Sequence, residues 1–292
     1  MPTIRSSTMP QHIFNVKKES HYRKTAFHCM VGEPKAEAVI TLPQTGVLKA
    51  SGLVPTPYDQ GGEGSCTANA WAMGLKVLRA KQKLLPLEHA RQYIYARERI
   101  LDGNLAVDAG AAVGDGALVL EKFGVCSEAT WPYTASNEFI VPSPVADAEA
   151  VACKLVSHIG LDLSPESLMV QLAQGRPCVF GFQVPASFES SEMARTGIMQ
   201  MPSKGEAVLG GHCVVALDYV MTKRSTVTQA YPWYARLLRS ILGMSSNGNS
   251  QGYFWVMNSW GAGWGQSGWF QMPFEVFVAV AFDPYAMESA SV

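Results

Sequence analysis

Apolar residues recur at helical spacing through the first half of the chain. A long helix that begins at Cys66 is predicted by the positions Ala68, Ala72, Met73, Leu75 and Leu78. A second helix is predicted over residues 86–101, because Pro86 suits a first turn and the apolar positions separate two faces. A third runs through GALVLEKFG and ends at Gly124. The first half is therefore expected to be helical.

In the second half the pattern changes to short apolar runs. Ser164 and Pro165 are typical of an N-cap and a first helical residue, and this helix is expected to end at Gly175. Strands are predicted by four runs rich in Val, Phe, Tyr and Trp: PCVFGFQV, HCVVALDYV, GYFWVMNSW and SGWFQMP. A helical half followed by a β-rich half indicates an α+β fold in two lobes, over residues 39–150 and 151–292.

Composition and charge narrow the class of protein. With 48% hydrophobic and 16% charged residues, the chain can bury enough apolar surface to fold as a globular protein. The formal net charge is -1 and no Lys/Arg run stands out, which argues against nucleic acid or an acidic membrane as a partner. No stretch approaches the ~18 to 20 apolar residues of a membrane helix, and the N-terminus lacks the apolar core of a secretory signal. We therefore expect a protein that is cytoplasmic or exported by another route, and separately we expect a monomer.

Six cysteines are present, and none lies in a CxxC or Cys/His ligand spacing. We therefore expect no bound metal and no cofactor, and most of the cysteines should be small, reduced, buried residues. Cys66 needs a different account. Its position at a predicted helix N-terminus favours the thiolate, and iodoacetamide at about pH 6 should label it ahead of the other cysteines.

The residues before Cys66 suit an oxyanion site. A tight turn with open backbone N–H groups is favoured by Gly61, Gly62, Gly64 and Ser65. Gln60 could supply a second donor. For a lone cysteine at a helix start, structural packing is the simpler interpretation, so the assignment depends on the rest of the chain.

Three separated motifs resemble the papain family of cysteine peptidases, in that family's order. They are DQGGEGSCTANA at 59–70, GGHCVVALDYV at 210–220 and VMNSWGAGWGQSGWFQMP at 256–273. The similarity extends to DAGAAVGDGALVLEKFGVCSEATWPY at 108–133, and covers nearly all of the chain from about residue 40. Within the family it is most similar to bacterial members. The resemblance implies a papain-like fold with the active site in the cleft between a helical and a β-rich lobe.

The resemblance also implies a role for each matching residue. Cys66 would attack the scissile carbonyl, and His212 would exchange the proton. Asn258 would orient the imidazole, and Trp260 would shield that hydrogen bond from water. Gln60 and the backbone N–H of Cys66 would hold the oxyanion. The same roles follow from the chemistry of a nucleophile activated by an oriented base.

Alignment with the family also suggests residues that contact an extended polypeptide substrate. Ala111 and Ala112 would line the wall that pairs with the substrate backbone, and Trp260 would also contact the substrate. The pocket for the second residue before the cut would lie near Val113, Gly114, Gly210 and Gly211. These small apolar residues predict a roomy hydrophobic pocket.

Several features depart from the family pattern. Glu63 stands where the local signature C-G-[SA]-C-[WY] has its first cysteine, so the disulfide from that position cannot form, and Thr67 replaces the aromatic residue. His212 follows Cys66 within the expected ~130 to 150 residues, whereas Asn258 lies beyond that range. The excess lies at 221–251, which we interpret as an insertion on a hairpin in which AYPWYARLLRSIL could form a short helix.

Three functions fit these residues. An endopeptidase working through a thioacyl enzyme is the leading hypothesis. Acyl transfer or isopeptide cleavage on the same fold is the second, and a binding protein that has lost the chemistry is the third. The last would normally lack the nucleophile or the base, and this chain has both.

Residues 1–38 are polar and irregular and precede the catalytic part. They include Phe14, Tyr22 and Phe27 among basic residues, so they could place an aromatic ring in an apolar subsite and cover the cleft. A frayed terminus without a role is the alternative.

Overall fold

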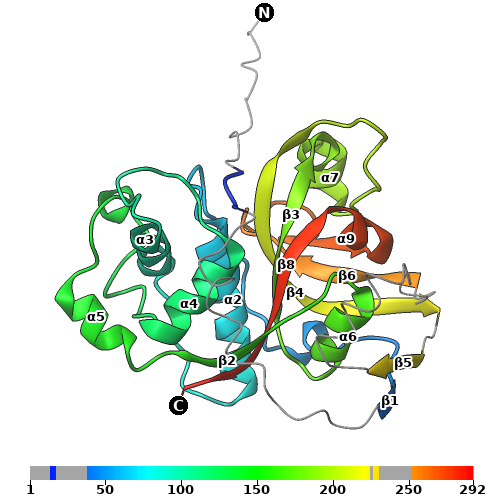
Figure 1. Ribbon diagram of the computed structural model, residues 1–292, viewed down its shortest axis with the longest axis horizontal. Helices are drawn as coiled ribbons and strands as arrows, with labels where there is room; N and C mark the ends of the chain where they lie inside the picture. Colours follow the sequence, from blue (N-terminus) through cyan, green and yellow to red (C-terminus); the bar gives the residue numbers. More distant parts are fainter. Residues whose placement is uncertain (1–13, 18–37, 224–225, 230–250, 292) are drawn as a thin grey trace, which may run out of the picture.

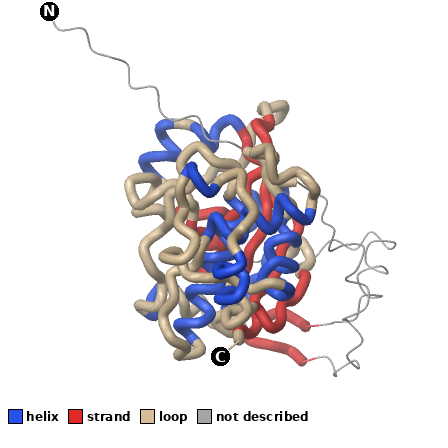
Figure 2. Tube along the Cα trace, turned by 90° about the vertical axis from the view of Figure 1, so that its left-hand side faces the viewer, coloured by secondary structure: helices blue, strands red, loops and turns tan. Residues whose placement is uncertain are grey.

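The computed structural model describes residues 14–17, 38–223, 226–229 and 251–291. Two lobes stand side by side, with helices on the left and a twisted sheet on the right in Figure 1. The described residues 14–17 form the short blue segment at the top of the boundary between them. When the helical lobe is turned toward the viewer, the strands lie behind the helices and loops (Figure 2).

The helical lobe is built around α2, which is buried along nearly its whole length. Its helices are α2 (Cys66–Lys81), α3 (Arg91–Leu101), α4 (Val113–Lys122) and α5 (Pro144–Ala150), with a 3-10 turn at Ala135–Asn137. Trp71 on α2 is fully buried and donates from Nε1 to the carbonyl of Val113, at 2.7 Å. This bond fixes the start of α4 against the helix that carries Cys66.

The sheet lobe contains a six-stranded antiparallel sheet in the order β2-β8-β3-β4-β6-β7. Its strands are β2 (Leu155–Gly160), β3 (Cys178–Pro185), β4 (Val208–Lys223), β6 (Gln251–Met257), β7 (Trp269–Pro273) and β8 (Ala281–Ala290). The lobe's helices are α6 (Pro165–Ala173), α7 (Ser191–Thr196) and α9 (Phe274–Val280), with 3-10 turns at Lys49–Ser51 and Ala186–Glu189. The central strands β3 and β4 are apolar on both faces because they pack against α2 on one side and α6 and α9 on the other.

A small second sheet joins distant parts of the chain. β1 (Ala38–Thr41) pairs with β5 (Thr226–Gln229) in antiparallel register. The following residues run along β4, where Met221 N donates to Gln44 O at 2.7 Å and Gly46 N to Tyr219 O at 3.1 Å. Residues 38–46 thus lie with the sheet lobe, although their place in the sequence put them in the helical one.

Most helices and strands predicted from the periodicity of apolar residues are present in the structure. α2 begins at Cys66, Ser164 Oγ caps α6 by accepting from Ser167 N at 3.2 Å, and the four predicted strands form β3, β4, β6 and β7. The predicted helix at 86–101 begins only at Arg91, because His89 instead bridges to Ser127. The possible helix in AYPWYARLLRSIL falls outside the described residues.

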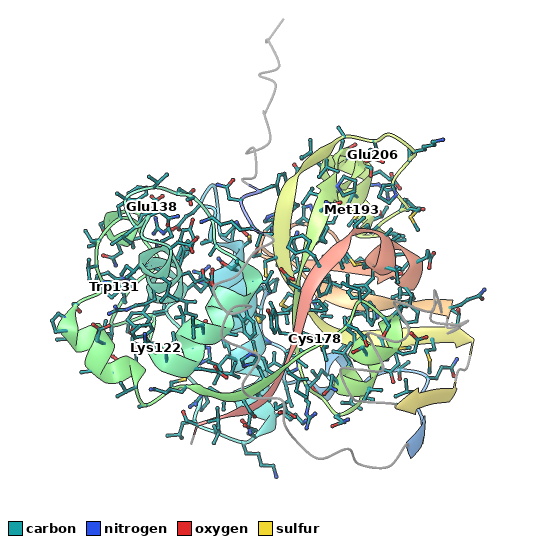
Figure 3. All side chains as sticks on the ribbon, viewed as in Figure 1. Lys122, Trp131, Glu138, Cys178, Met193 and Glu206 are labelled. Atoms are coloured by element: carbon teal, nitrogen blue, oxygen red, sulfur yellow. The ribbon has the colours of Figure 1, made fainter. Side chains whose placement is uncertain are left out.

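Side chains fill the space between the ribbons of both lobes, and Glu138 and Glu206 mark the upper rims of the helical and sheet lobes (Figure 3). Within the described ranges, no helix is both long enough and apolar enough to cross a membrane.

Gly116 tests the packing between α2 and α4. A Cβ there would come within 2.2 Å of Trp71 Cδ1, and the indole is held by its bond to Val113. Gly116→Ala should lower the free energy of unfolding by about 1 to 2 kcal/mol, since the overlap costs more than the ~1 kcal/mol that Ala gains from helix propensity. Urea unfolding would measure this change. The control is Gly263→Ala, where a Cβ meets nothing within 4 Å; equal stabilities of the two variants would contradict the packing argument.

Candidate active site

Cys66 is the first residue of α2 and is completely buried at the boundary of the lobes. Asn69 secures the turn before it, because Asn69 N and Nδ2 both donate to the carbonyl of Ser65, at 3.1 and 2.9 Å. The backbone N–H of Cys213, the residue after His212 on β4, is near enough to the Cys66 thiol to act on its pKa. The thiol carried by one lobe thus lies near the strand of the other lobe that carries the imidazole.

His212 and Asn258 form a buried hydrogen-bonded pair. His212 Nε2 lies 2.8 Å from Asn258 Oδ1, and Ser259 N donates to the same oxygen at 2.9 Å. An amide oxygen that accepts from Nε2–H fixes the tautomer, so proton exchange falls to Nδ1. Asn258 is held in turn by its backbone N–H, which donates to Gly268 O at 2.9 Å.

Aromatic rings enclose the imidazole. Trp260 stacks on His212 with ring centroids 5.1 Å apart, and Phe182 meets it edge-on at 5.7 Å. Phe188 packs behind Trp260 at 5.5 Å. These rings exclude water from the bond between His212 and Asn258, which strengthens it.

Gln60 is buried beside this pair, and its side chain is held at both ends. Ser259 Oγ donates to Gln60 Oε1, and Gln60 Nε2 donates to Glu63 O at 2.8 Å. An amide nitrogen carries two N–H donors, and the contact with Glu63 uses one of them. The other can serve an oxyanion next to Cys66.

Asp108 braces the loop that precedes the nucleophile. Its carboxylate accepts from Gly64 N, at 2.9 Å, and from the hydroxyl of Tyr95. Tyr95 also accepts from Gly110 N at 3.0 Å. One carboxylate therefore ties the loop before Cys66 to the loop that leads to Ala111. The first of these loops contains Glu63, the position at which the family disulfide was predicted to be absent.

Residues 14–17 lie between the two lobes, at the top of their boundary in Figure 1. Lys17 N donates to Ala111 O at 2.9 Å, and Val16 N donates to Gly211 O at 3.1 Å. Phe14 places its ring 6.0 Å from the rings of both His212 and Trp260.

The predicted substrate-contacting residues divide into two groups. Ala111 and Ala112 on one side and Gly210 and Gly211 on the other flank residues 14–17. A Cβ on Gly210 would come within 2.4 Å of Phe14 O, so this wall has to be small. Val113 and Gly114 instead lie in the first turn of α4 and are buried.

Burial raises the pKa of the Cys66 thiol to about 12, although backbone N–H groups of Cys213, Thr67 and Cys66 act in the opposite direction. A carboxyl group lies nearby: Thr67 Oγ1 donates to Glu98 Oε2 at 2.7 Å, and burial raises the pKa of Glu98 well above its usual range. Burial thus favours the thiol form of Cys66 over the thiolate. The expected rapid labelling at pH 6 would require the sulfur to become exposed to solvent.

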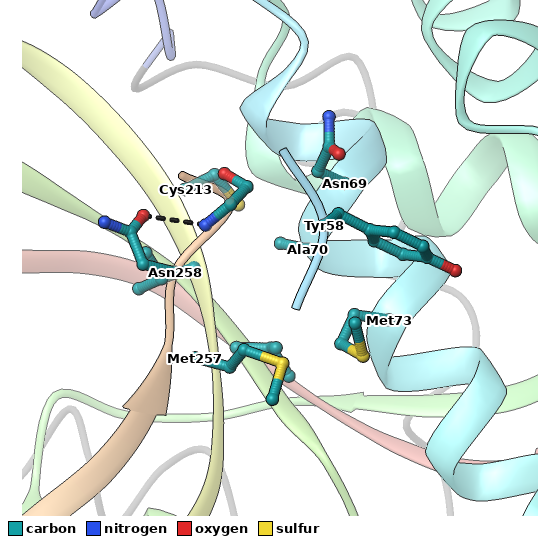
Figure 4. Close-up of a pocket in the computed structure, with 10 residues that line it drawn as sticks. Tyr58, Asn69, Ala70, Met73, Cys213, Met257 and Asn258 are labelled. Carbon is teal, nitrogen blue, oxygen red and sulfur yellow. Dashed lines mark hydrogen bonds between the residues drawn. The ribbon is translucent and has the colours of Figure 1, made fainter. Parts of the chain in front are cut away.

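A small cavity lies beneath the site, between α2 and β4, as Figure 4 shows. Asn69 and Met73 border it from α2, and Cys213 and Asn258 from the sheet lobe. Among the described residues, no group of His, Cys, Asp and Glu side chains could hold a metal ion.

Reasoning from the sequence missed Ser259 and Asp108. Both stand inside motifs that carry the family resemblance, Ser259 in NSWG and Asp108 at the start of DAGAA. Their roles depend on partners distant in the sequence, Gln60 and Gly64. The motifs could therefore have indicated that these two positions matter, but not which residues they contact.

A family model described as "Papain family cysteine protease" matches residues 47–280. The chain belongs to this family. It is 32% identical over 249 residues to the uncharacterized peptidase C1-like protein L477 of Acanthamoeba polyphaga mimivirus, covering 81% of this chain and 67% of that protein. It is also 25% identical to the thiol protease aleurain of Arabidopsis thaliana, but spans only 56% of that protein's length.

Solved structures show the same fold. Xylellain, a cysteine protease from Xylella fastidiosa, has a TM-score of 0.71 at 26% identity, over 99% of this chain and 100% of that one. The bromelain protease from Ananas comosus has a TM-score of 0.60 at 17% identity, over 86% and 100% of the two chains. The two-lobed α+β papain-like fold is thereby confirmed, as is the similarity to a bacterial member, xylellain.

Phe14 tests whether residues 14–17 cover the nucleophile. Phe14→Ala removes the ring that packs on His212 and Trp260, and should speed alkylation of Cys66 by iodoacetamide at pH 6. Because burial raises the pKa of the thiol, uncovering it lowers that pKa and moves the rise in labelling rate to lower pH. Site-resolved mass spectrometry over a pH series measures both effects. Phe139→Ala, at a more exposed ring, is the control; equal labelling of Cys66 in the wild type and Phe14→Ala would exclude the cover.

Proposed function

We propose that this papain-family protein is an endopeptidase that cleaves peptide bonds through a thioacyl enzyme, with Cys66 as nucleophile and His212 as base. The observation that supports it most directly is the His212–Asn258 hydrogen bond of 2.8 Å beside a thiol at a helix N-terminus. This is the arrangement that an activated nucleophile requires: a base next to it, oriented by a third group.

The first half of the reaction forms the thioester. The proton of the Cys66 thiol passes to His212, and the sulfur attacks the carbonyl carbon of the scissile bond. The carbonyl oxygen becomes an oxyanion, which Gln60 and the backbone N–H of Cys66 stabilise. His212 then gives its proton to the departing amine as the carbon–nitrogen bond breaks.

The second half restores the enzyme. His212 takes a proton from water, whose oxygen attacks the thioester carbon. The carbon–sulfur bond breaks, the acid product leaves, and Cys66 recovers its proton from the imidazole. Asn258 keeps the ring in one plane during both transfers, because its oxygen accepts from Nε2 throughout.

This chemistry fixes the direction of a productive substrate. The departing amine must lie next to His212, so the residues after the cut lie toward His212 and Trp260 and those before it toward Ala111 and Ala112. Residues 14–17 run the other way, with Phe14 at His212 and Lys17 at Ala111. The segment therefore fills the cleft without presenting a peptide bond in the direction that leads to cleavage.

We infer that the N-terminal segment regulates the enzyme by occupying its cleft. A tethered segment acts at an effective concentration of order millimolar, so weak contacts suffice to exclude substrate. If it also shields the Cys66 thiol from water, it disfavours the thiolate in addition to blocking access.

Gln60→Ala tests the oxyanion site. We expect kcat to fall on the order of a hundredfold or more, as for loss of one oxyanion donor, while the protein still folds. Steady-state hydrolysis of a fluorogenic peptide measures the effect, with the exposed Gln44→Ala as control. Near-normal turnover in Gln60→Ala would remove Gln60 from the mechanism.

Removal of the N-terminal segment tests the regulation. Because β1 begins at Ala38, the deletion should end at residue 37 to leave the β1–β5 sheet intact. The shortened enzyme should hydrolyse small peptides with a lower apparent KM, since the tethered competitor is gone. Active-site titration of both forms separates inhibition from misfolding. Identical kinetics in two fully titrating forms would leave the segment without an inhibitory role.

A further inference from the structure

The C-terminal end of α3 borders the groove at the side that receives the residues before the cut. Lys17, whose backbone is bonded to Ala111 O, extends its side chain to this end and forms an ion pair with Asp102. The carboxylate is largely buried, with 12% of its side chain exposed. The side chain of a peptide bound at this part of the groove can thus reach Asp102.

Two other groups at this point favour a positive charge. With the Asn104 amide oriented so that its Nδ2 donates to Arg99 O at 3.1 Å, its Oδ1 accepts from Lys17 Nζ, also at 3.1 Å. Asp102 is the C-cap residue of α3, where the negative end of the helix dipole attracts cations. A carboxylate, an amide oxygen and a helix C-terminus therefore surround one ammonium group.

The loop that carries these oxygens is held in place from below. Arg99 is fully buried, and its guanidinium donates to the carbonyls of Leu105, at 3.2 Å, and Glu138. Asn104 N donates to Arg99 O at 2.9 Å. Because these bonds do not involve Lys17, the loop can keep its shape when the segment leaves.

Nearby charges add to the preference. Glu138 and Asp108 lie close enough that the charge of Asp108 contributes, after burial, to raising the pKa of Glu138. The positive charge of Arg99 acts in the opposite direction on Glu138, although its guanidinium is engaged by backbone carbonyls and by the face of Tyr95, 4.1 Å from the ring centroid. Asp108 thus adds negative charge near Glu138, partly offset by Arg99.

We propose that Asp102 and Asn104 form a subsite for a basic side chain, which Lys17 occupies in the covered enzyme and which a Lys or Arg of the polypeptide substrate occupies during cleavage. This rests on the proposed peptidase function and names its substrate class: peptides with a basic residue two to four positions before the cut. Asp102 is a specificity-determining residue, not a participant in bond breaking.

The first test compares substrates on the full-length protein. Internally quenched peptides carry Lys, norleucine or Glu at the second, third or fourth position before the cut, and the ratio of kcat/KM for Lys to that for norleucine is measured. The segment competes equally with every peptide, so the ratio does not depend on how much enzyme is covered. We expect a ratio of about tenfold at one position, from a partly exposed ion pair near a helix C-terminus.

Asp102→Asn should bring this ratio close to one while hydrolysis of the norleucine peptide is retained. Glu275→Gln, an exposed acid on α9, should leave the ratio unchanged. Ratios that are the same in the wild type and Asp102→Asn at all three positions would overturn the subsite, although hydrolysis itself would still support the peptidase.

The second test needs no turnover. Lys17→Glu should speed the alkylation of Cys66 by iodoacetamide, and the double variant Lys17→Glu/Asp102→Lys should slow it again by restoring an ion pair. If Lys17→Glu labels no faster than the wild type, the cation site is refuted. If the double variant is protected but no peptide is hydrolysed, the cation site stands and the peptidase proposal fails.

Discussion

Two backbone hydrogen bonds between the lobes determine where the reacting groups lie. Gln60 N donates to Ser259 O at 2.9 Å, and Gly261 N donates to Tyr58 O at 2.8 Å. One strand of this pairing leads directly into the loop before Cys66, and the other directly follows Asn258. The register of the pairing therefore sets where the loop before Cys66 meets the residues after Asn258, and catalytic groups have to be placed to a fraction of an ångström. The Gln60 side chain, which accepts from Ser259 Oγ, depends on the same register.

Burial of the active site has one effect that favours catalysis and one that opposes it. Excluding water strengthens the hydrogen bond between His212 and Asn258, and this bond orients the base. Excluding water also raises the pKa of the Cys66 thiol, and this disfavours the thiolate that acts as the nucleophile. The two demands are reconciled if the aromatic shell is permanent and the cover over Cys66 is removable. Trp260 and Phe182 belong to the sheet lobe, whereas Phe14 lies in the N-terminal segment, which the chain connects to the lobes only through β1.

The sequence predicted the elements whose signals are local. The start of α2 at Cys66 and the cap of α6 at Ser164 follow from residues within one turn of each other. The late start of α3 could not be predicted, because His89 takes an extended conformation to bridge Ser127 across the lobe. β8 was missed for a related reason: it is recruited by pairing with β2 and β3 and has no strict alternation of its own. The partners of Gln60 and Gly64 likewise depend on which loops the fold brings together.

The loop before the nucleophile is braced by a carboxylate where a cystine would be expected, and all five cysteines of the described residues are free. An enzyme with a catalytic thiol is exposed to oxidation and relies on a reductant to return the sulfur to its working state. If a disulfide held the loop next to the catalytic cysteine, the reductant that restores the catalytic thiol would also reduce that disulfide. Here the two are chemically independent, so the reagent that regenerates Cys66 leaves the loop that presents it untouched.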